Sequence, residues 1–270
     1  MSGNNTLATG PGYDAKAPLV PEHPGSPMAV ASAPPPRIEV PTGRSPRSAR
    51  SRRWLRTGLR TLAGLALGYL ALWATGALGI LALSYWAREE TPPPEGAYAV
   101  RGIHHFQPVD ARRTLWRGGA PSPDGYRTLA RRGFSTVVDL RAEDLTAAQL
   151  AGPHEAGLDV VRLPVRDGQT PTPRQVERFL RVVREAPGPV FVHCGAGVGR
   201  TGAMVAAYLV RTGQESAPAA VRRNLAVGPP SVEQIYYGLS LGRDRADQPP
   251  LPVVAVSRLV DAPRRMWSRL

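Results

Sequence analysis

The chain has 270 residues, enough for one sizeable domain with extensions. Its formal net charge of +13 comes almost wholly from arginine, because Lys16 is the only lysine, and it contains one cysteine. A single cysteine excludes a framework of intramolecular disulfides. The excess of arginine is compatible with three classes of partner, which are nucleic acid, an anionic membrane and phosphorylated substrates.

The first 52 residues are expected to form a disordered, proline-rich basic tail. Residues 1–48 carry ten prolines and a single aromatic residue, Tyr13. A segment of this composition cannot bury enough apolar surface to offset the entropy that ordering costs. The folded parts of the chain are therefore expected after residue 52.

A membrane-spanning helix with a basic flank is predicted over residues 53–88. Residues 61–87 form an apolar run of 27 residues without a charge, which exceeds the roughly 20 residues needed to cross a hydrocarbon core. Eight arginines lie in residues 37–60, whereas Arg88 is followed by two glutamates on the far side. By the positive-inside rule, a single-pass protein is expected, with a cytoplasmic N-terminus and an extracytoplasmic domain after residue 88.

Two other interpretations of this region stay open. Residues 51–61, SRRWLRTGLRT, are compatible with a degenerate twin-arginine export signal, and the whole region with a cleaved signal peptide. The apolar run is longer than an ordinary signal-peptide core, and this favours an uncleaved anchor. Anionic lipid and topology account for the arginine cluster beside the span, so no nucleic-acid partner is expected.

An α/β domain is predicted over residues 100–245, after a stiff proline linker at residues 89–99. Helices are expected over residues 122–133, 146–157, 172–186 and 201–213, and strands over residues 134–140, 159–165 and 189–193. This alternation predicts a central, mostly parallel sheet flanked by helices. Residues 246–270 are expected to be a C-terminal tail, whose basic end is compatible with a solvated terminus or with an amphipathic segment on a membrane.

Capping residues mark the ends of two of these helices. Ser122 is the expected N-cap of the first one, with Pro123 in its first turn and Gly133 after its end, and Thr172 with Pro173 opens the third. The strand PVFVH, residues 189–193, is continuously apolar, which is typical of a parallel strand buried on both faces.

The only cysteine, Cys194, follows this strand directly and begins the sequence CGAGVGRTG. In an α/β sheet, the segment between a strand and the next helix forms the ligand site. The glycines allow backbone N–H groups to turn inward and bind an anion at the helix N-terminus. The same N–H groups and the helix dipole favour a thiolate on Cys194, and Arg200 offers a planar fork for phosphate oxygens.

HCGAGVGRTG, residues 193–202, is similar at every defining position to the CX5R loop of the cysteine-dependent protein tyrosine and dual-specificity phosphatases, in particular the compact bacterial type. The resemblance covers roughly residues 100–240. It implies a hydrolase with a phosphocysteine intermediate on Cys194, a Thr201 hydroxyl that assists the leaving thiolate, and a His193 ring that organises the loop and lowers the thiol pKa. It also implies no metal and no other cofactor. The implied phosphate-binding residues are Gly195, Ala196, Gly197, Val198, Gly199 and Arg200.

The general acid that such a mechanism needs is assigned to Asp167, because LPVRDGQTPTPRQVERFL resembles the acid loop of compact members of the family. Asp139, at a strand end in VVDLR, is interpreted as structural. Asp144 and Asp159 are weaker candidates for the general acid. Gln234 in SVEQIYYGL resembles the glutamine that positions water in larger tyrosine phosphatases. A glutamine on a helix surface is an equally good interpretation of that residue.

The expected substrate is a phosphorylated protein, and dephosphorylation of an inositol phosphate or lipid headgroup is the alternative. No counterpart of the tyrosine-bearing loop of classical tyrosine phosphatases is evident, which predicts a shallow site and leaves phosphoserine and phosphothreonine open. Residues 195–199 also lack the lysine usual in phosphoinositide 3-phosphatases. A module that binds phosphorylated partners without turnover is a third hypothesis, and the oligomeric state is not predicted.

Overall fold

The computed structural model describes the backbone of residues 46–95, 97, 99–245 and 247–267. Most of the tail predicted over residues 1–52 lies outside these residues. Residues 54–270 belong to one compact unit. The helices and strands of the described residues are α1 (Pro46–Glu90), β1 (Gln107–Pro108), β2 (Leu115–Gly118), α2 (Pro123–Arg131), β3 (Thr136–Arg141), α3 (Ala147–Glu155), β4 (Asp159–Val165), α4 (Pro173–Glu185), β5 (Val190–His193), α5 (Gly199–Arg211), α6 (Ala217–Val227), α7 (Val232–Ser240) and α8 (Leu251–Trp267).

The five strands form one sheet in the order β1-β2-β5-β3-β4. The short edge strand β1 pairs antiparallel with β2, and all the other pairs are parallel. The predicted mostly parallel α/β sheet flanked by helices is therefore confirmed. In the register of the two central strands, Asp139 of β3 lies opposite His193 of β5, so the residues that follow these two strands emerge at the same edge of the sheet.

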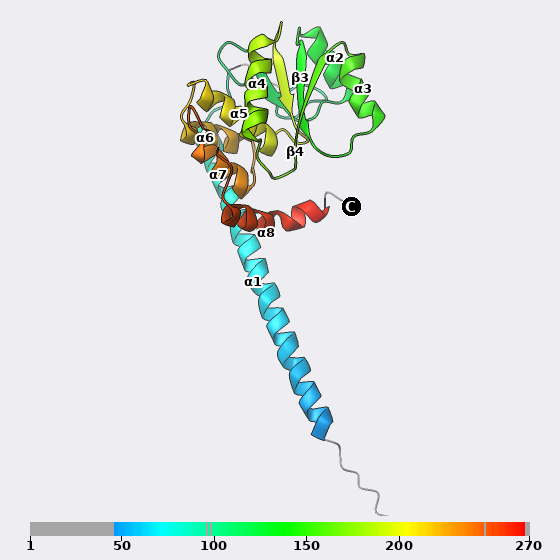
Figure 1. Cartoon of the computed structure of the whole chain (residues 1–270), viewed down its shortest axis with the longest axis vertical. Coiled ribbons are helices and arrows are strands. Elements are labelled where there is room, and N and C mark those ends of the chain that lie inside the picture. Colours follow the sequence, from blue (N-terminus) through cyan, green and yellow to red (C-terminus); the bar gives the residue numbers. More distant parts are fainter. Residues whose placement is uncertain (1–45, 96, 98, 246, 268–270) are drawn as a thin grey trace, which may run out of the picture. The chain divides into compact units, whose positions relative to one another are not determined.

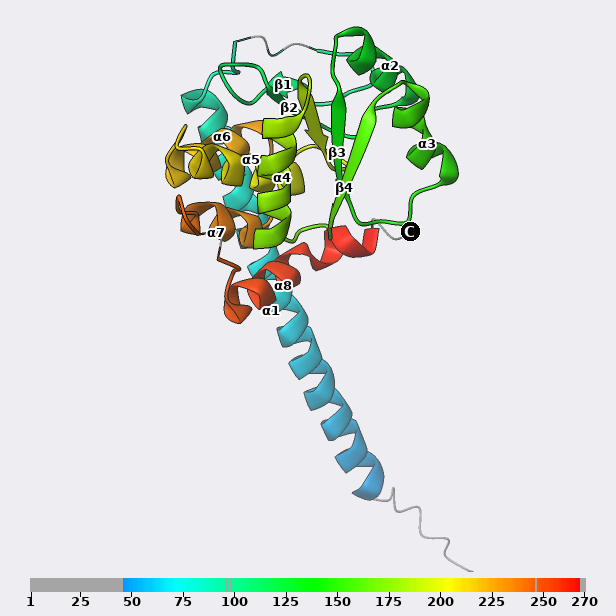
Figure 2. The ribbon, with the colours of Figure 1, turned by 45° about the horizontal axis from the view of Figure 1, so that its top comes forward.

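The strands β2, β3 and β5 are buried on both faces, and their successive side chains alternate between two cores. Val138 and Val192 point into the core formed with α4, α5 and α7, whereas Val137 and Phe191 point into the core beneath α2. Figures 1 and 2 show α2 and α3 on one face and α4 to α7 on the other. This double burial explains the uninterrupted apolar sequence of β5.

Side-chain caps begin several helices where the sequence predicts them. The Ser122 hydroxyl accepts a hydrogen bond from the Gly125 N–H at the start of α2. Thr172 forms a reciprocal capping box with Gln175 at the start of α4. Gly133, just after α2, has a φ of +80°, in the left-handed region that glycine adopts without strain.

Helix α1 contains the apolar run. Its portion Arg52–Glu90 has 39 residues and contains an 18-residue window with a mean hydropathy of 1.8, so by length and composition it is able to cross a membrane. Near its C-terminal end one face packs on the domain: Ala87 is buried with Val221 and Leu225 of α6, and the Arg88 Nε donates to the Ala226 carbonyl at 3.1 Å.

Residues 251–267, which the sequence analysis assigns to a C-terminal tail, form helix α8. Ser257 and Val260, one turn apart, are buried, and the Glu233 N–H of α7 donates to the Ser257 hydroxyl at 3.1 Å. The apolar residues of this segment thus follow a helical period, which its basic character obscured.

Candidate active site

Cys194 is buried at the carboxyl end of β5, and the loop of residues 194–199 (the cysteine loop) joins it to α5. Gly195 and Ala196 are exposed, whereas Gly197 and the Arg200 side chain are buried. The cysteine therefore lies at the floor of a loop whose upper rim faces solvent, as predicted for a ligand site at the end of a parallel strand.

The N-terminus of α5 has no side-chain cap. Val198 occupies the N-cap position and makes no side-chain hydrogen bond, in contrast to Ser122, Thr146, Thr172 and Ser231 at the starts of α2, α3, α4 and α7. The first N–H groups of a helix need an acceptor. Those of α5 have no side-chain acceptor at the N-cap, so an anion in the cysteine loop would be a suitable acceptor for them.

Gly197 is required by both its conformation and its surroundings. Its φ is +78°, and a Cβ at this position would overlap the backbone of Gly118 and Gly119. In the segment after β2, the Ala120 N–H donates a hydrogen bond to the Gly195 carbonyl of the cysteine loop at 2.8 Å. The GG pair of LWRGGAP thus forms the wall against which the cysteine loop packs.

We expect Gly197→Ala to destabilise the protein by about 3 kcal/mol or more, because the added Cβ must displace main-chain atoms in addition to straining φ. Gly133→Ala is the matched control, since Gly133 has a φ of +80° but no atom within 4 Å of an added Cβ. The control is expected to cost about 1 kcal/mol. Thermal unfolding of both full-length variants in detergent measures the difference, and equal losses would show that the close approach to Gly118 is unimportant.

Arg117 of β2 supports the cysteine loop from beneath. Its side chain is only 2% exposed, and its NH2 donates to the Gly197 carbonyl at 2.8 Å and to the Asn224 Oδ1 at 3.0 Å. Burial lowers the pKa of Arg117 to about 10, and the charge of Cys194 opposes this shift. The guanidinium remains protonated at neutral pH, so a fixed positive charge lies under the anion-binding loop.

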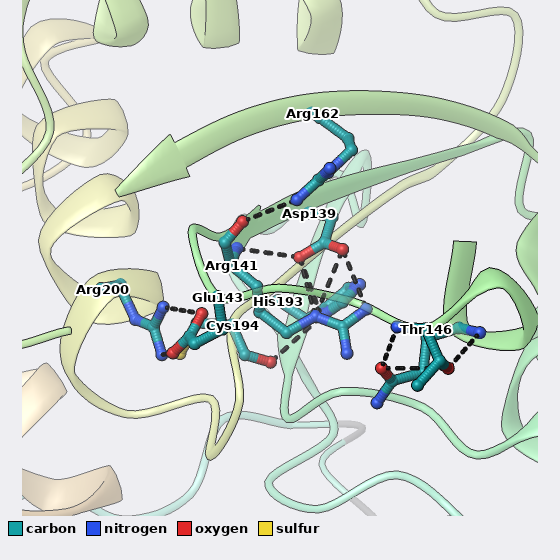
Figure 3. Close-up of polar contacts among 9 residues, drawn as sticks. Asp139, Arg141, Glu143, Thr146, Arg162, His193, Cys194 and Arg200 are labelled. Atoms are coloured by element: carbon teal, nitrogen blue, oxygen red, sulfur yellow. Dashed lines mark hydrogen bonds and ion pairs between the residues drawn. The ribbon is translucent and has the colours of Figure 1, made fainter. Parts of the chain in front are cut away.

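Arg200 is held by two carboxylates at the opening of the site. Its NH1 donates to the Glu143 Oε2 at 2.8 Å and its NH2 lies 2.7 Å from the Glu143 Oε1, a bidentate pair. The same NH2 lies 3.4 Å from the Asp167 Oδ1, and NH1 also donates to the Val165 carbonyl at 3.2 Å. Figure 3 shows Glu143 and Arg200 beside Cys194.

The charges of this cluster stabilise one another. Burial lowers the pKa of Arg200, but the Glu143 hydrogen bond and the charges of Cys194 and Asp167 raise it more, so the net shift is upward. For Glu143, burial raises the pKa and the hydrogen bond with Arg200 lowers it, with a net decrease. Both partners are therefore ionised at neutral pH.

Asp167 lies in the loop of residues 166–171 between β4 and α4 (the aspartate loop), and its side chain is 34% exposed. Helix α7 and the segment after it bind this loop. The Ser231 hydroxyl donates to the Gly168 carbonyl at 2.8 Å, and the Gln248 Nε2 donates to the Pro171 carbonyl at 2.9 Å. The structure thus brings Asp167 to the same opening as Arg200.

Gln234 is buried rather than exposed on a helix surface. Its Oε1 accepts from the Ser231 N–H at 3.0 Å in the capping box of α7, and its Nε2 donates to the Gln169 carbonyl at 2.9 Å. The amide also touches the start of α5, because a Cβ added to Gly199 would contact it. Gln234 therefore joins α7, the aspartate loop and the cysteine loop, and its predicted water-positioning role stays a prediction.

His193 is fully buried at the end of β5. Its Nδ1 lies 3.1 Å from the Cys194 carbonyl, and since a carbonyl only accepts, Nδ1 carries the proton. Burial lowers the pKa of His193 to about 4, although Asp139 opposes the shift. The ring is thus neutral at pH 7 and acts on the cysteine loop through this hydrogen bond. Asp139 itself forms a buried ion pair with Arg141 at 2.9 Å, the structural role expected for it (Figure 3).

The buried neutral state of His193 predicts a pH-dependent loss of stability. The unfolded ring titrates near 6.5 and the folded ring near 4, so between these values the unfolded state binds more protons and stability falls as pH decreases. We expect His193 to contribute about 3 kcal/mol to this loss. Chemical denaturation of the wild type and His193→Gln at pH 7 and pH 4.5 measures it. Parallel stability curves for the two proteins would contradict the assignment.

The Thr201 hydroxyl is fully buried in α5, and within the described residues it has no hydrogen-bond partner. An unsatisfied buried hydroxyl costs free energy. Its predicted role beside the cysteine stays a prediction.

Two residues of the site were missed in the sequence. Glu143 lies two residues after the end of β3, in LRAED, at the sheet edge where β5 also ends. Its position, a carboxylate just after a parallel strand, is the feature of the sequence that could have indicated a site residue. Arg117 interrupts the apolar strand β2 and is fully enclosed, and a charged residue between Trp116 and a glycine pair was its signal.

A loop that holds a buried cysteine between a parallel strand and an uncapped helix, followed by a buried arginine, is typical of a cysteine-dependent phosphatase. Residues 97–238, more than half of the chain, match a family model described as "DSP-PTPase phosphatase fused to NAD+ Kinase". The chain therefore belongs to this family of dual-specificity-type protein tyrosine phosphatases. The predicted family and cysteine-dependent hydrolase class are confirmed.

Curated relatives match about a third of the chain. The "Probable NAD kinase 2, chloroplastic" of Oryza sativa subsp. japonica is 41% identical over 100 residues, which cover 35% of this chain and 10% of that protein. The "Dual specificity protein phosphatase CDC14C" of Homo sapiens is 35% identical over 91 residues, covering 33% of this chain and 20% of the relative. The chain thus spans between a tenth and a fifth of the length of these relatives.

Among solved structures, P. aeruginosa TpbA is similar to this chain with 25% sequence identity and a TM-score of 0.45. The match covers 63% of this chain and 99% of TpbA.

Proposed function

We propose that this protein is a membrane-anchored phosphatase that hydrolyses phosphate monoesters of proteins through a phosphocysteine on Cys194. The arrangement that supports the proposal is the cysteine loop, in which the only thiol lies between β5 and the uncapped N-terminus of α5, with Arg200 beside it (Figure 3). Backbone N–H groups and a planar cation together suit a phosphate with three equatorial oxygens.

In the first chemical step, the Cys194 Sγ attacks phosphorus and the bond from phosphorus to the leaving oxygen breaks. Asp167, protonated at this stage, donates its proton to that oxygen, so an alcohol or phenol leaves. The 3.4 Å separation of Asp167 and Arg200 supports this role, since it brings the carboxyl to the rim where the leaving group must lie. Arg200 and the loop N–H groups stabilise charge on the equatorial oxygens.

In the second step, water attacks the phosphocysteine while the Asp167 carboxylate accepts a proton from it. The bond between sulfur and phosphorus breaks, which releases inorganic phosphate and restores the thiolate. Gln234 is proposed to help position this water with the second hydrogen of its amide nitrogen, because the first already binds the Gln169 carbonyl. Thr201 is proposed to donate its otherwise unpaired hydroxyl to the departing thiolate.

Glu143 is proposed to orient Arg200 for phosphate binding. We expect Glu143→Gln to lower kcat/KM by about tenfold, the value of one charge-assisted hydrogen bond. Glu143→Asp keeps the charge and is expected to retain more activity. Steady-state kinetics with an aryl phosphate, together with the Kd of the inhibitor vanadate, tests this role, and an unchanged kcat/KM in Glu143→Gln would exclude it.

The proposed substrate is a phosphorylated protein side chain, with an inositol phosphate or lipid headgroup as the alternative. The exposure of Gly195 and Ala196 supports a shallow site that accepts phosphorylated serine and threonine in addition to tyrosine. Initial rates on phosphopeptides of the three kinds and on soluble inositol phosphates distinguish the classes. A kcat/KM that is highest for an inositol phosphate would overturn the first choice.

The proposed anchor is the apolar portion of α1, with the N-terminus in the cytoplasm and the phosphatase domain outside it. The length and hydropathy of α1 support the anchor, and the arginines before residue 61 support the orientation. Protease added to intact right-side-out cells is expected to degrade the domain and leave the N-terminal tail. Protection of the domain would reverse the orientation.

The phosphatase proposal is tested by incubating the full chain in detergent with a generic aryl phosphate and measuring phenol and inorganic phosphate. Equal release of both products is expected. A folded protein that binds vanadate but releases neither product would exclude the hydrolase and support a module that binds phosphorylated partners without turnover.

A further inference from the structure

Helix α8 presents large apolar side chains to solvent. Leu251 is 83% exposed, Val256 45% and Leu259 49%, while Ser257 and Val260 face inward. We propose that α8 is a second membrane contact, a helix that lies in the outer half of the bilayer and holds the active site beside the membrane. This inference rests on the proposed anchoring by α1.

A specific hydrogen bond fastens α8 to the apolar run of α1. The Tyr69 hydroxyl donates to the Leu259 carbonyl at 3.0 Å. In a regular helix that carbonyl would accept from the N–H of residue 263, but residue 263 is Pro263, which has none. Tyr69 thus satisfies the acceptor that proline leaves open, and this need is greatest in a lipid environment without water.

Close packing supports the same contact one to two turns further along α1. A Cβ added to Gly76 would lie 3.1 Å from both methyl groups of Val260, so the glycine allows the two helices to approach. Tyr69 and Gly76 follow Arg60, the last charge before the run, by 9 and 16 residues. At 1.5 Å per residue these positions lie about 14 and 24 Å from Arg60, so in a core about 30 Å thick Tyr69 lies near the midplane and Gly76 lies in the outer half.

Lipid is the occupant that fits the outward side of α8, because the surface is continuous with α1. The α1 side chains on either side of the contact, among them Leu70, Leu72 and Trp73, are exposed leucines and an aromatic residue. Amphipathic helices of this kind bury their apolar side at the boundary of headgroups and acyl chains. The exposed Arg258 is long enough to reach the headgroup phosphates from there.

The segment before α8 connects this membrane contact to the catalytic machinery. The Gln248 Oε1 accepts from the Thr170 hydroxyl at 3.1 Å, and its Nε2 binds the Pro171 carbonyl, both in the aspartate loop. The N-terminus of α7, which binds Ser257, also carries Gln234. Figure 2 shows α8 crossing α1 on the side of the sheet where β4 ends. The opening at Arg200 and Asp167 is thereby held near the bilayer surface.

The test places a fluorophore on an introduced cysteine at Val256 in the full-length Cys194→Ser protein, reconstituted in phosphatidylcholine vesicles with some phosphatidylglycerol. Glu185→Cys is the control, because Glu185 is exposed and ends α4, which runs back from the aspartate loop to the opposite end of the sheet. The Val256 probe is expected to be quenched by nitroxide lipids and to show about fivefold weaker quenching by aqueous iodide than the control.

Adding Tyr69→Phe to the Val256 probe protein checks that α1 holds α8. Iodide quenching is expected to rise toward the control value while the protein still floats with the vesicles. Equal iodide quenching at Val256 and Glu185 in a protein that floats would overturn the inference and leave the anchor intact. Failure to float would overturn both. A Val256 probe shielded from iodide but not quenched by nitroxide lipids would assign the surface to a second copy of the chain, and the inference would fall.

Discussion

Replacing Cys194 by serine is expected to abolish hydrolysis of an aryl phosphate, with a loss on the order of 10⁴- to 10⁶-fold in kcat, the scale that follows removal of a covalent nucleophile. A serine hydroxyl is intrinsically a far weaker acid and a poorer nucleophile than a thiol, so it cannot replace the sulfur in the attack on phosphorus. The side chain is buried at the floor of the loop, and serine fits the same space. The fold and the phosphate site are therefore expected to survive.

Phosphate binding separates loss of chemistry from loss of structure. The Kd of tungstate, measured by calorimetry, is expected to change by less than about tenfold in Cys194→Ser, because Arg200 and the N–H groups of α5 remain. A variant that keeps a tenth or more of the wild-type kcat would contradict the phosphocysteine mechanism. Wild-type protein trapped during turnover by acid quench is expected to carry one phosphate per chain.

Replacing Asp167 by asparagine is expected to reduce kcat by about 10²- to 10³-fold, the usual contribution of a general acid. The reduction is expected to grow as the leaving group becomes more basic, since a poor leaving group needs the proton most. An alkyl phosphate should therefore lose more than a nitrophenyl phosphate.

Asp144→Asn is the matched control for this experiment. Asp144 is an exposed carboxylate in the loop after β3, close in sequence to Glu143, and its removal changes the net charge by the same amount. Its kinetics are expected to stay within about twofold of the wild type. If Asp144→Asn shows the leaving-group dependence and Asp167→Asn does not, the general acid has been assigned to the wrong loop.

Local signals in the sequence predicted much of the fold. Ser122 and Thr172 begin helices because their side chains accept hydrogen bonds from N–H groups only three residues away. The strand after Gly188 reads as continuously apolar because helices cover both of its faces. Each of these features depends on neighbours within one turn or one strand, so the sequence alone contains the needed information.

Only part of the site could be predicted from such local signals in the sequence. Cys194, the loop glycines and Arg200 are adjacent in the chain, whereas Glu143 reaches Arg200 across 57 positions and Arg117 reaches Gly197 across 80. Such pairs form because the sheet order places β2 and β3 on either side of β5. That order cannot be read from the spacing of residues. Gln234 shows the same limit, since its burial results from how α7 packs against two loops.

The uncapped start of α5 makes the ligand a component of the folded structure. At the starts of α2, α3, α4 and α7 a serine or threonine side chain accepts a hydrogen bond from the first turn, but Val198 at the start of α5 makes none. A protein whose loop binds an anion is then expected to be more stable than the empty protein, by an amount that grows with ligand concentration. Added phosphate is therefore expected to slow the local opening of the cysteine loop and its cleavage by proteases.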